Sequence, residues 1–61
     1  MSIKMLRLKA GMTQVQLAKK MHVDQAAVSR WESGATKPMR KTHRRLAKVL
    51  NCTVEELFAE V

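Results

Sequence analysis

The sequence predicts a small all-α protein made of five short helices. Residues that end or interrupt helices, Gly11, Gly34, Pro38 and Asn51, divide the 61 residues into helix-sized segments. No segment of useful length alternates apolar and polar residues as a strand does. The chain is 46% hydrophobic, which supplies one small core. We therefore expect residues 1–61 to form a single domain.

The first two expected helices lie on either side of Gly11. Residues 3–9 have one apolar face, and Gly11 tolerates the left-handed conformation that ends a helix. Thr13 is then expected to be the N-cap of a second helix, because Gln16 three residues later completes a capping box. This second helix should continue to Met21.

A third helix follows a break at His22. Asp24 is a favourable N-cap residue, and the helix is expected to run from Gln25 to about Ser33. Gly34 should end it, because glycine is common immediately after the last helical turn.

The last two helices follow Pro38. Proline disfavours helical backbone at its own position and at the residue before it, so the chain before Pro38 is expected to be a loop. A fourth helix is expected over residues 39–50, with Asn51 in the left-handed position after it. Thr53 and Glu56 form a second capping box, which predicts a short fifth helix.

Charge is unevenly distributed along the chain. Twelve Lys and Arg against five Asp and Glu give a formal net charge of +7. Residues 1–50 contain all the basic residues and two acidic ones, whereas residues 51–61 contain three glutamates and no basic residue. A small cationic body favours polyanions such as DNA, RNA or an anionic membrane surface. The acidic end should face away from any nucleic acid; the alternative is a solvated basic surface without a partner.

Several kinds of protein are disfavoured by the sequence. No apolar run reaches the about 20 residues that span a bilayer, and no signal-peptide pattern is present, so a cytoplasmic location is expected. His22, His43 and Cys52 lack the spacing of a metal site. We expect no metal, no cofactor and no enzyme activity. Cys52 is expected to be a small core residue, and the methionines after the first to fill gaps in the core.

Residues 13–33 meet the requirements of a helix-turn-helix. Two short helices flank a tight break, and the outer face of the second is polar enough to enter a major groove about 12 Å wide. The chain resembles the lambda-repressor/Cro-type (XRE) helix-turn-helix family in these residues at fixed spacing: Thr13-Gln14-x-x-Leu17-Ala18, Val23, Val28-Ser29-x-Trp31-Glu32-x-Gly34 and Pro38. The resemblance covers nearly the whole chain. It implies a compact five-helix DNA-binding domain with the helix-turn-helix at about 14–33, in a bacterial or phage-encoded, nucleoid-associated protein.

The resemblance implies that the third helix is the recognition helix, which reads base edges in DNA. Its exposed residues suit this role, because Gln pairs with adenine, Ala contacts the thymine methyl group and Arg pairs with guanine. The expected base-reading residues are Gln25, Ala26, Ser29 and Arg30. Arg30 has a phosphate contact as its alternative role.

Phosphate contacts are implied on both sides of the recognition helix. Thr13 and Gln14 stand at the start of the second helix, where backbone N–H groups favour anions. Lys37, Arg40 and Lys41 follow the recognition helix and are also expected to contact phosphates.

Two further positions take structural roles from the resemblance. Arg7 and Glu32 are expected to form a partly buried ion pair. The family usually has glycine in the turn where this chain has His22, a position that requires positive φ. Histidine is among the residues enriched at positive φ, so His22 is interpreted as a tolerated turn residue.

The sequence and the resemblance together predict a sequence-specific regulator of transcription that binds double-stranded DNA. We expect a repressor that binds an inverted-repeat operator as a weak homodimer. Val54, Phe58 and Val61 fall near one stripe of the uncharged-to-acidic C-terminal segment and are the expected dimer interface. The alternative is an antitoxin or protein-binding adaptor that also regulates its own gene through DNA binding.

Overall fold

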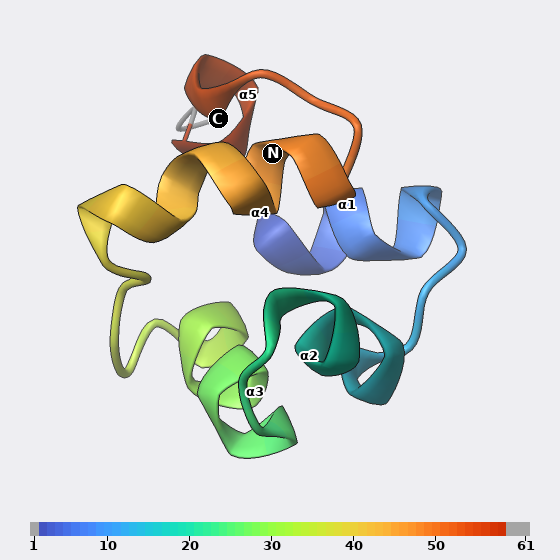
Figure 1. Ribbon diagram of the computed structural model, residues 1–61, viewed down its shortest axis with the longest axis vertical. Coiled ribbons are helices and arrows are strands. Elements are labelled where there is room, and N and C mark those ends of the chain that lie inside the picture. Colours follow the sequence, from blue (N-terminus) through green and yellow to red (C-terminus); the bar gives the residue numbers. More distant parts are fainter. Residues whose placement is uncertain (1, 59–61) are drawn as a thin grey trace.

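The protein is all-α, as the sequence predicts. The computed structural model describes residues 2–58, with the side chains of residues 2–57. The helices are α1 (Ile3–Lys9), α2 (Gln14–Met21), α3 (Gln25–Ser33), the 3-10 helix η1 (Arg40–Thr42), α4 (His43–Val49) and α5 (Val54–Phe58). Figure 1 shows α2 and α3 side by side at one end of the molecule and α5 at the other, with α4 crossing α1 between them.

The segment expected to be one fourth helix is divided in two. Met39 has an extended backbone (φ −62°, ψ 149°), so helical structure begins only at Arg40. The first turn is the 3-10 helix η1, in which the Thr42 N–H donates to the Met39 carbonyl oxygen at 2.8 Å. Neither Met39 nor Thr42 supplies a side-chain cap. Hydrogen bonds between residues three apart therefore use the first N–H groups of this segment, which a capping side chain would otherwise accept.

Helices α1, α2 and α4 end in the same way. Each is followed by a residue with positive φ: Gly11 (73°), His22 (59°) and Asn51 (55°). In each case two backbone N–H groups donate to carbonyls three and five residues earlier, over 2.9–3.3 Å, which is the Schellman arrangement. The expectation of positive φ at His22 is therefore correct. Glycine adopts this conformation without strain, whereas the histidine here adopts it at some cost in strain.

One apolar core joins the helices. Its centre consists of Leu17 from α2, Val28 from α3 and Leu46 from α4, all with no exposed surface. The remaining buried apolar residues around this centre are Ile3, Leu6, Ala18, Met21, Ala47, Leu50 and Leu57. Because every α-helix contributes to this core, the relative placement of α2 and α3 depends on packing of the whole molecule.

The expectation for the methionines is correct at two positions and wrong at two. Met21 is buried and Met12 packs half-buried against the core. Met5 and Met39 are 57% and 63% exposed. Met5 lies on the outer side of α1, and Met39 precedes η1 in the extended connection after Pro38. Within residues 2–58, no helix is both long and apolar enough to cross a membrane.

Candidate nucleic-acid interface

The two helices of the expected helix-turn-helix begin with well-formed caps. At the start of α2, the Thr13 hydroxyl oxygen accepts the Gln16 N–H at 3.1 Å, and the Thr13 N–H donates to Gln16 Oε1 at 2.8 Å. At the start of α3, the Asp24 carboxylate accepts the Ala27 N–H at 2.9 Å. These caps determine where each helix begins and hence which residues stand in its first turn.

A buried ion pair fixes α1 against α3. Arg7 Nε donates to Glu32 Oε2 at 2.6 Å and Arg7 Nη2 to Glu32 Oε1 at 3.3 Å. Arg7 Nη1 also donates to the Met12 carbonyl oxygen at 2.8 Å. The two side chains are only 8% and 5% exposed, so the pair is held out of water. The structure thus joins the two residues that the resemblance pairs.

The Glu32 carboxylate remains ionised despite its burial. Burial alone would raise the pKa of this carboxyl group. Hydrogen bonds from Arg7 and Gln14, and the positive charges of Arg7 and Lys4, outweigh burial and lower the pKa below its ordinary value. A fully charged carboxylate at neutral pH accepts hydrogen bonds and donates none.

The charged carboxylate orients a chain of amide groups that ends at α3. Gln14 Nε2 donates to Glu32 Oε1 at 2.9 Å, which leaves Gln14 Oε1 as an acceptor. Gln25 Nε2 then donates to Gln14 Oε1 at 3.3 Å. Glu32 therefore determines the orientation of Gln14, and Gln14 in turn that of Gln25. Local sequence patterns do not reveal this chain, because its members stand 18 and 11 residues apart.

The orientation leaves Gln25 with one free donor and one free acceptor. Its second Nε2–H and its Oε1 have no hydrogen-bond partner among residues 2–57, and the residue is exposed at the first position of α3. Adenine presents an acceptor, N7, beside a donor, the N6 amino group, in the major groove. The free groups of Gln25 match this pair.

The other residues expected to read bases share an exposed face of α3. Ala26, Ser29 and Arg30 are all exposed and stand three and four residues apart on the helix. The Arg30 guanidinium has no ion pair with any described residue. The opposite face of α3 carries Val28, which is fully buried.

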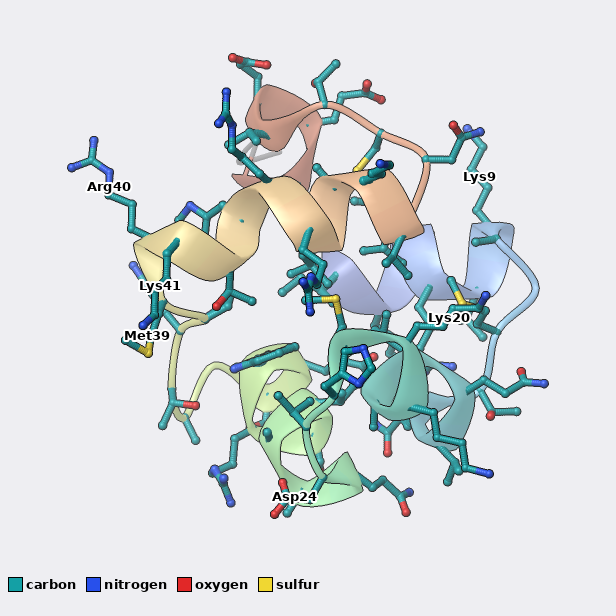
Figure 2. The ribbon with its side chains drawn as sticks, in the orientation of Figure 1. Lys9, Lys20, Asp24, Met39, Arg40 and Lys41 are labelled. Carbon is teal, nitrogen blue, oxygen red and sulfur yellow. The ribbon has the colours of Figure 1, made fainter. Side chains whose placement is uncertain are left out.

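The residues expected to contact phosphates stand at both ends of this surface. Thr13 and Gln14 are at the start of α2, and the Thr13 hydroxyl proton remains available because only its oxygen is used by the cap. Lys37, Arg40 and Lys41 are exposed in the connection from α3 to α4, without ion pairs among the described residues. Figure 2 shows Arg40 and Lys41 together at the edge of the molecule, apart from Lys9 and Lys20.

The acidic segment lies away from α3. Glu55 and Glu56 are exposed on α5, at the opposite end of the molecule from α3 (Figure 1). Of the expected dimer interface, Val54 is half-buried against the core. The side chain of Phe58 and the whole of Val61 lie outside the described residues.

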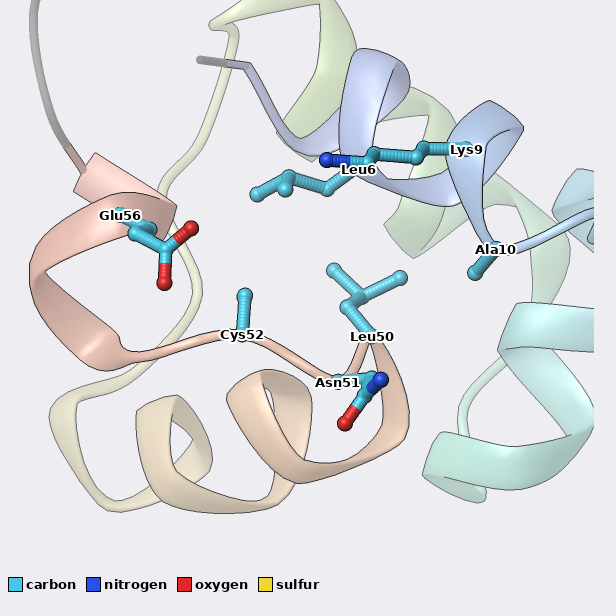
Figure 3. Close-up of a pocket in the computed structure, with 7 residues that line it drawn as sticks. All are labelled: Leu6, Lys9, Ala10, Leu50, Asn51, Cys52 and Glu56. Carbon is cyan, nitrogen blue, oxygen red and sulfur yellow. The ribbon is translucent and has the colours of Figure 1, made fainter.

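A hollow of about 170 Å³ lies between α1 and the connection from α4 to α5 (Figure 3). Leu6 and Leu50 give it apolar surface, and Lys9 and Glu56 also line it. Cys52 also lines it, half-buried. Burial and the nearby Glu56 carboxylate raise the pKa of the Cys52 thiol, so the thiol remains protonated at neutral pH. Within residues 2–58, no three His, Cys, Asp or Glu side chains are grouped to hold a metal ion.

Comparison with known proteins gives the same family as the motif. A helix-turn-helix family model matches residues 3–57. The HTH-type transcriptional activator BcrR of Enterococcus faecalis is 33% identical over 57 residues, which are 93% of this chain and 28% of that protein. An uncharacterized HTH-type transcriptional regulator of Archaeoglobus fulgidus is 38% identical over 56 residues, 92% of this chain and 80% of that protein. No solved structure shows significant similarity.

The family match covers α1 to α4 and all but the last residue of α5, and it includes the capped helices and the turn at His22. The chain spans less than a third of the length of the first relative. Sequence match and fold agree that this chain belongs to the lambda-repressor/Cro-type (XRE) helix-turn-helix family of DNA-binding transcriptional regulators.

Proposed function

We propose that residues 1–61 act as one DNA-binding unit that recognises an inverted-repeat operator as a homodimer and represses transcription by occupying a promoter. The observation that carries the proposal is the Glu32–Gln14–Gln25 chain of hydrogen bonds. A side chain that is held in place before binding loses less entropy when it meets a base. Gln25 is therefore the residue that discriminates most strongly, and we assign it to adenine.

Base contacts by Ala26, Ser29 and Arg30 extend this readout along α3. Phosphate contacts from Gln14 on one side and from the cations after α3 on the other place the helix in the major groove. A single recognition helix covers few base pairs, and a two-fold dimer doubles the readout by placing two helices about 34 Å apart.

Charge supports an interface built from α4 and α5. Helix α4 carries exposed Arg44, Arg45 and Lys48, whereas Glu55 and Glu56 are exposed on the adjacent α5. In a two-fold interface every contact occurs twice, once from each copy. If the cations of α4 in one copy meet the carboxylates of α5 in the other, the same attraction therefore forms a second time. The apolar stripe Val54, Phe58 and Val61 belongs to this interface in our proposal.

Selection of bound sequences from a random DNA pool tests the proposal. We expect an inverted repeat with one adenine per half-site that Gln25→Ala no longer selects. Sedimentation on the selected site should give two protomers per duplex, and Glu55→Lys, which reverses an exposed charge outside the DNA surface, should weaken this assembly but not half-site binding. A one-to-one complex on the palindrome would refute the homodimer.

A promoter fused to a reporter gene tests the direction of regulation. Repression requires that the selected site overlap the promoter and that reporter output fall when the protein is expressed. Increased output would refute repression and leave DNA recognition intact, as for the relative that is named an activator.

A further inference from the structure

Met39 is an exposed apolar side chain in an otherwise cationic segment. Its exposed fraction, 63%, is larger than that of Met5, Leu8 or Val15, the other large apolar residues exposed among those described. Single exposed apolar residues are common on protein surfaces, so exposure alone assigns no role. The surroundings of Met39 distinguish it from Met5.

The backbone that carries Met39 is anchored on both sides. Before it, the Thr36 N–H donates to the Arg30 carbonyl oxygen of α3 at 3.4 Å, and Pro38 is buried. The Pro38 carbonyl oxygen lies 3.1 Å from His43 Nε2 of α4. After it, the Met39 carbonyl oxygen accepts the Thr42 N–H at 2.8 Å. The side chain therefore projects from a fixed position between α3 and α4.

The charges around Met39 favour one kind of partner. Lys37, Arg40 and Lys41 flank it and are exposed without ion pairs among the described residues. Figure 2 shows Met39, Arg40 and Lys41 together at one edge of the molecule. The DNA backbone alternates charged phosphates with sugars whose C–H groups are apolar. A row of cations interrupted by one apolar side chain complements that alternation.

We propose that Met39 packs against a deoxyribose of the duplex that the recognition helix binds, between phosphates held by its cationic neighbours. This inference rests on the proposed DNA binding and adds a contact that is neither electrostatic nor base-specific. Such a contact fixes the position of the connection along the backbone and contributes through apolar burial.

The test compares DNA affinity at several salt concentrations for Met39→Ala, Arg40→Ala and Met5→Ala. Met39→Ala should weaken binding about fivefold on every DNA sequence. This is the size of effect expected when a few apolar groups are no longer buried in the complex. Its salt dependence should equal that of the wild type, because no counterion is released at an apolar contact. Arg40→Ala should reduce the salt slope. Met5→Ala removes another exposed methionine, from α1, and should change neither quantity.

Two conservative variants and a footprint separate the contact from a merely structural role. Met39→Leu should retain the affinity, whereas Met39→Gln, similar in size but polar, should behave as Met39→Ala. Bound DNA should protect Met39, but not Met5, from oxidation by hydrogen peroxide, as read by mass spectrometry.

Three outcomes overturn the inference. The first is wild-type affinity in Met39→Ala, which would leave Met39 available for a protein partner. The second is a reduced salt slope in that variant, which would mean that Met39 only positions the cations. The third is unprotected Met39 in the complex. A wild-type protein that binds no DNA would instead refute the proposed function, and with it this contact.

Discussion

Removal of the Glu32 carboxylate should be among the most destabilising single changes in this protein. Glu32→Ala would leave the Arg7 guanidinium, 7% exposed as a residue, with the Met12 carbonyl as its remaining described partner. Breaking a buried ion pair from one side costs about 3–5 kcal/mol, because the other charge stays desolvated. A chain of this size has a total unfolding free energy of about 3–9 kcal/mol. The variant should therefore lose a large part of its unfolding free energy.

Replacement of both partners should restore most of this stability. In Arg7→Met/Glu32→Leu no buried charge remains, and apolar replacement of a whole ion pair is often neutral or stabilising. Urea unfolding followed by circular dichroism measures the wild type, both single variants and the double variant. The expected coupling between the two sites is at least about 2 kcal/mol.

The double variant also separates stability from recognition. It folds in our expectation but lacks the carboxylate that orients Gln14, so its DNA affinity should fall even where it is fully folded. The reasoning fails if Glu32→Ala costs less than about 1 kcal/mol, the size typical of an exposed pair. It also fails if the folded double variant binds its site as tightly as the wild type.

Four further predictions can be checked separately. Binding should depend steeply on salt: about four phosphate contacts per protomer give a log–log slope near −7 for a dimer, and Lys37→Ala or Arg40→Ala should make it shallower. Gln25→Ala should cost about 1–3 kcal/mol on the preferred site and relax preference at one base position in a binding selection. Because folding lowers the pKa of Glu32, its contribution to stability is present above the ordinary value of 4.5 and is lost as pH falls through the lower value of the folded state. The urea midpoint should therefore fall with pH in this range, and the pH dependence should be weaker in Glu32→Gln. His22→Gly should raise the unfolding free energy by about 0.5–1 kcal/mol, since it relieves positive-φ strain; an unchanged midpoint would indicate that the turn is not strained.

Much of the helical framework could be predicted because its signals are local. The capping pairs Thr13 with Gln16 and Thr53 with Glu56 act across three residues and are both present. The helix ends at Gly11 and Asn51 likewise depend on the backbone preference of one residue. The fourth helix begins later than expected and with a 3-10 turn, because neither Met39 nor Thr42 supplies a side-chain cap.

The sequence by itself determined where most helices begin and end, the cationic body and acidic end, and the residues that carry the family motif. The family resemblance pairs Arg7 with Glu32. Only the tertiary structure decided that hydrogen bonds continue from Glu32 through Gln14 to Gln25, and that Met39 is exposed beside the cations. The physical reason is range. Caps and turns depend on residues within a few positions, whereas these contacts exist only after the core brings α1, α2 and α3 together.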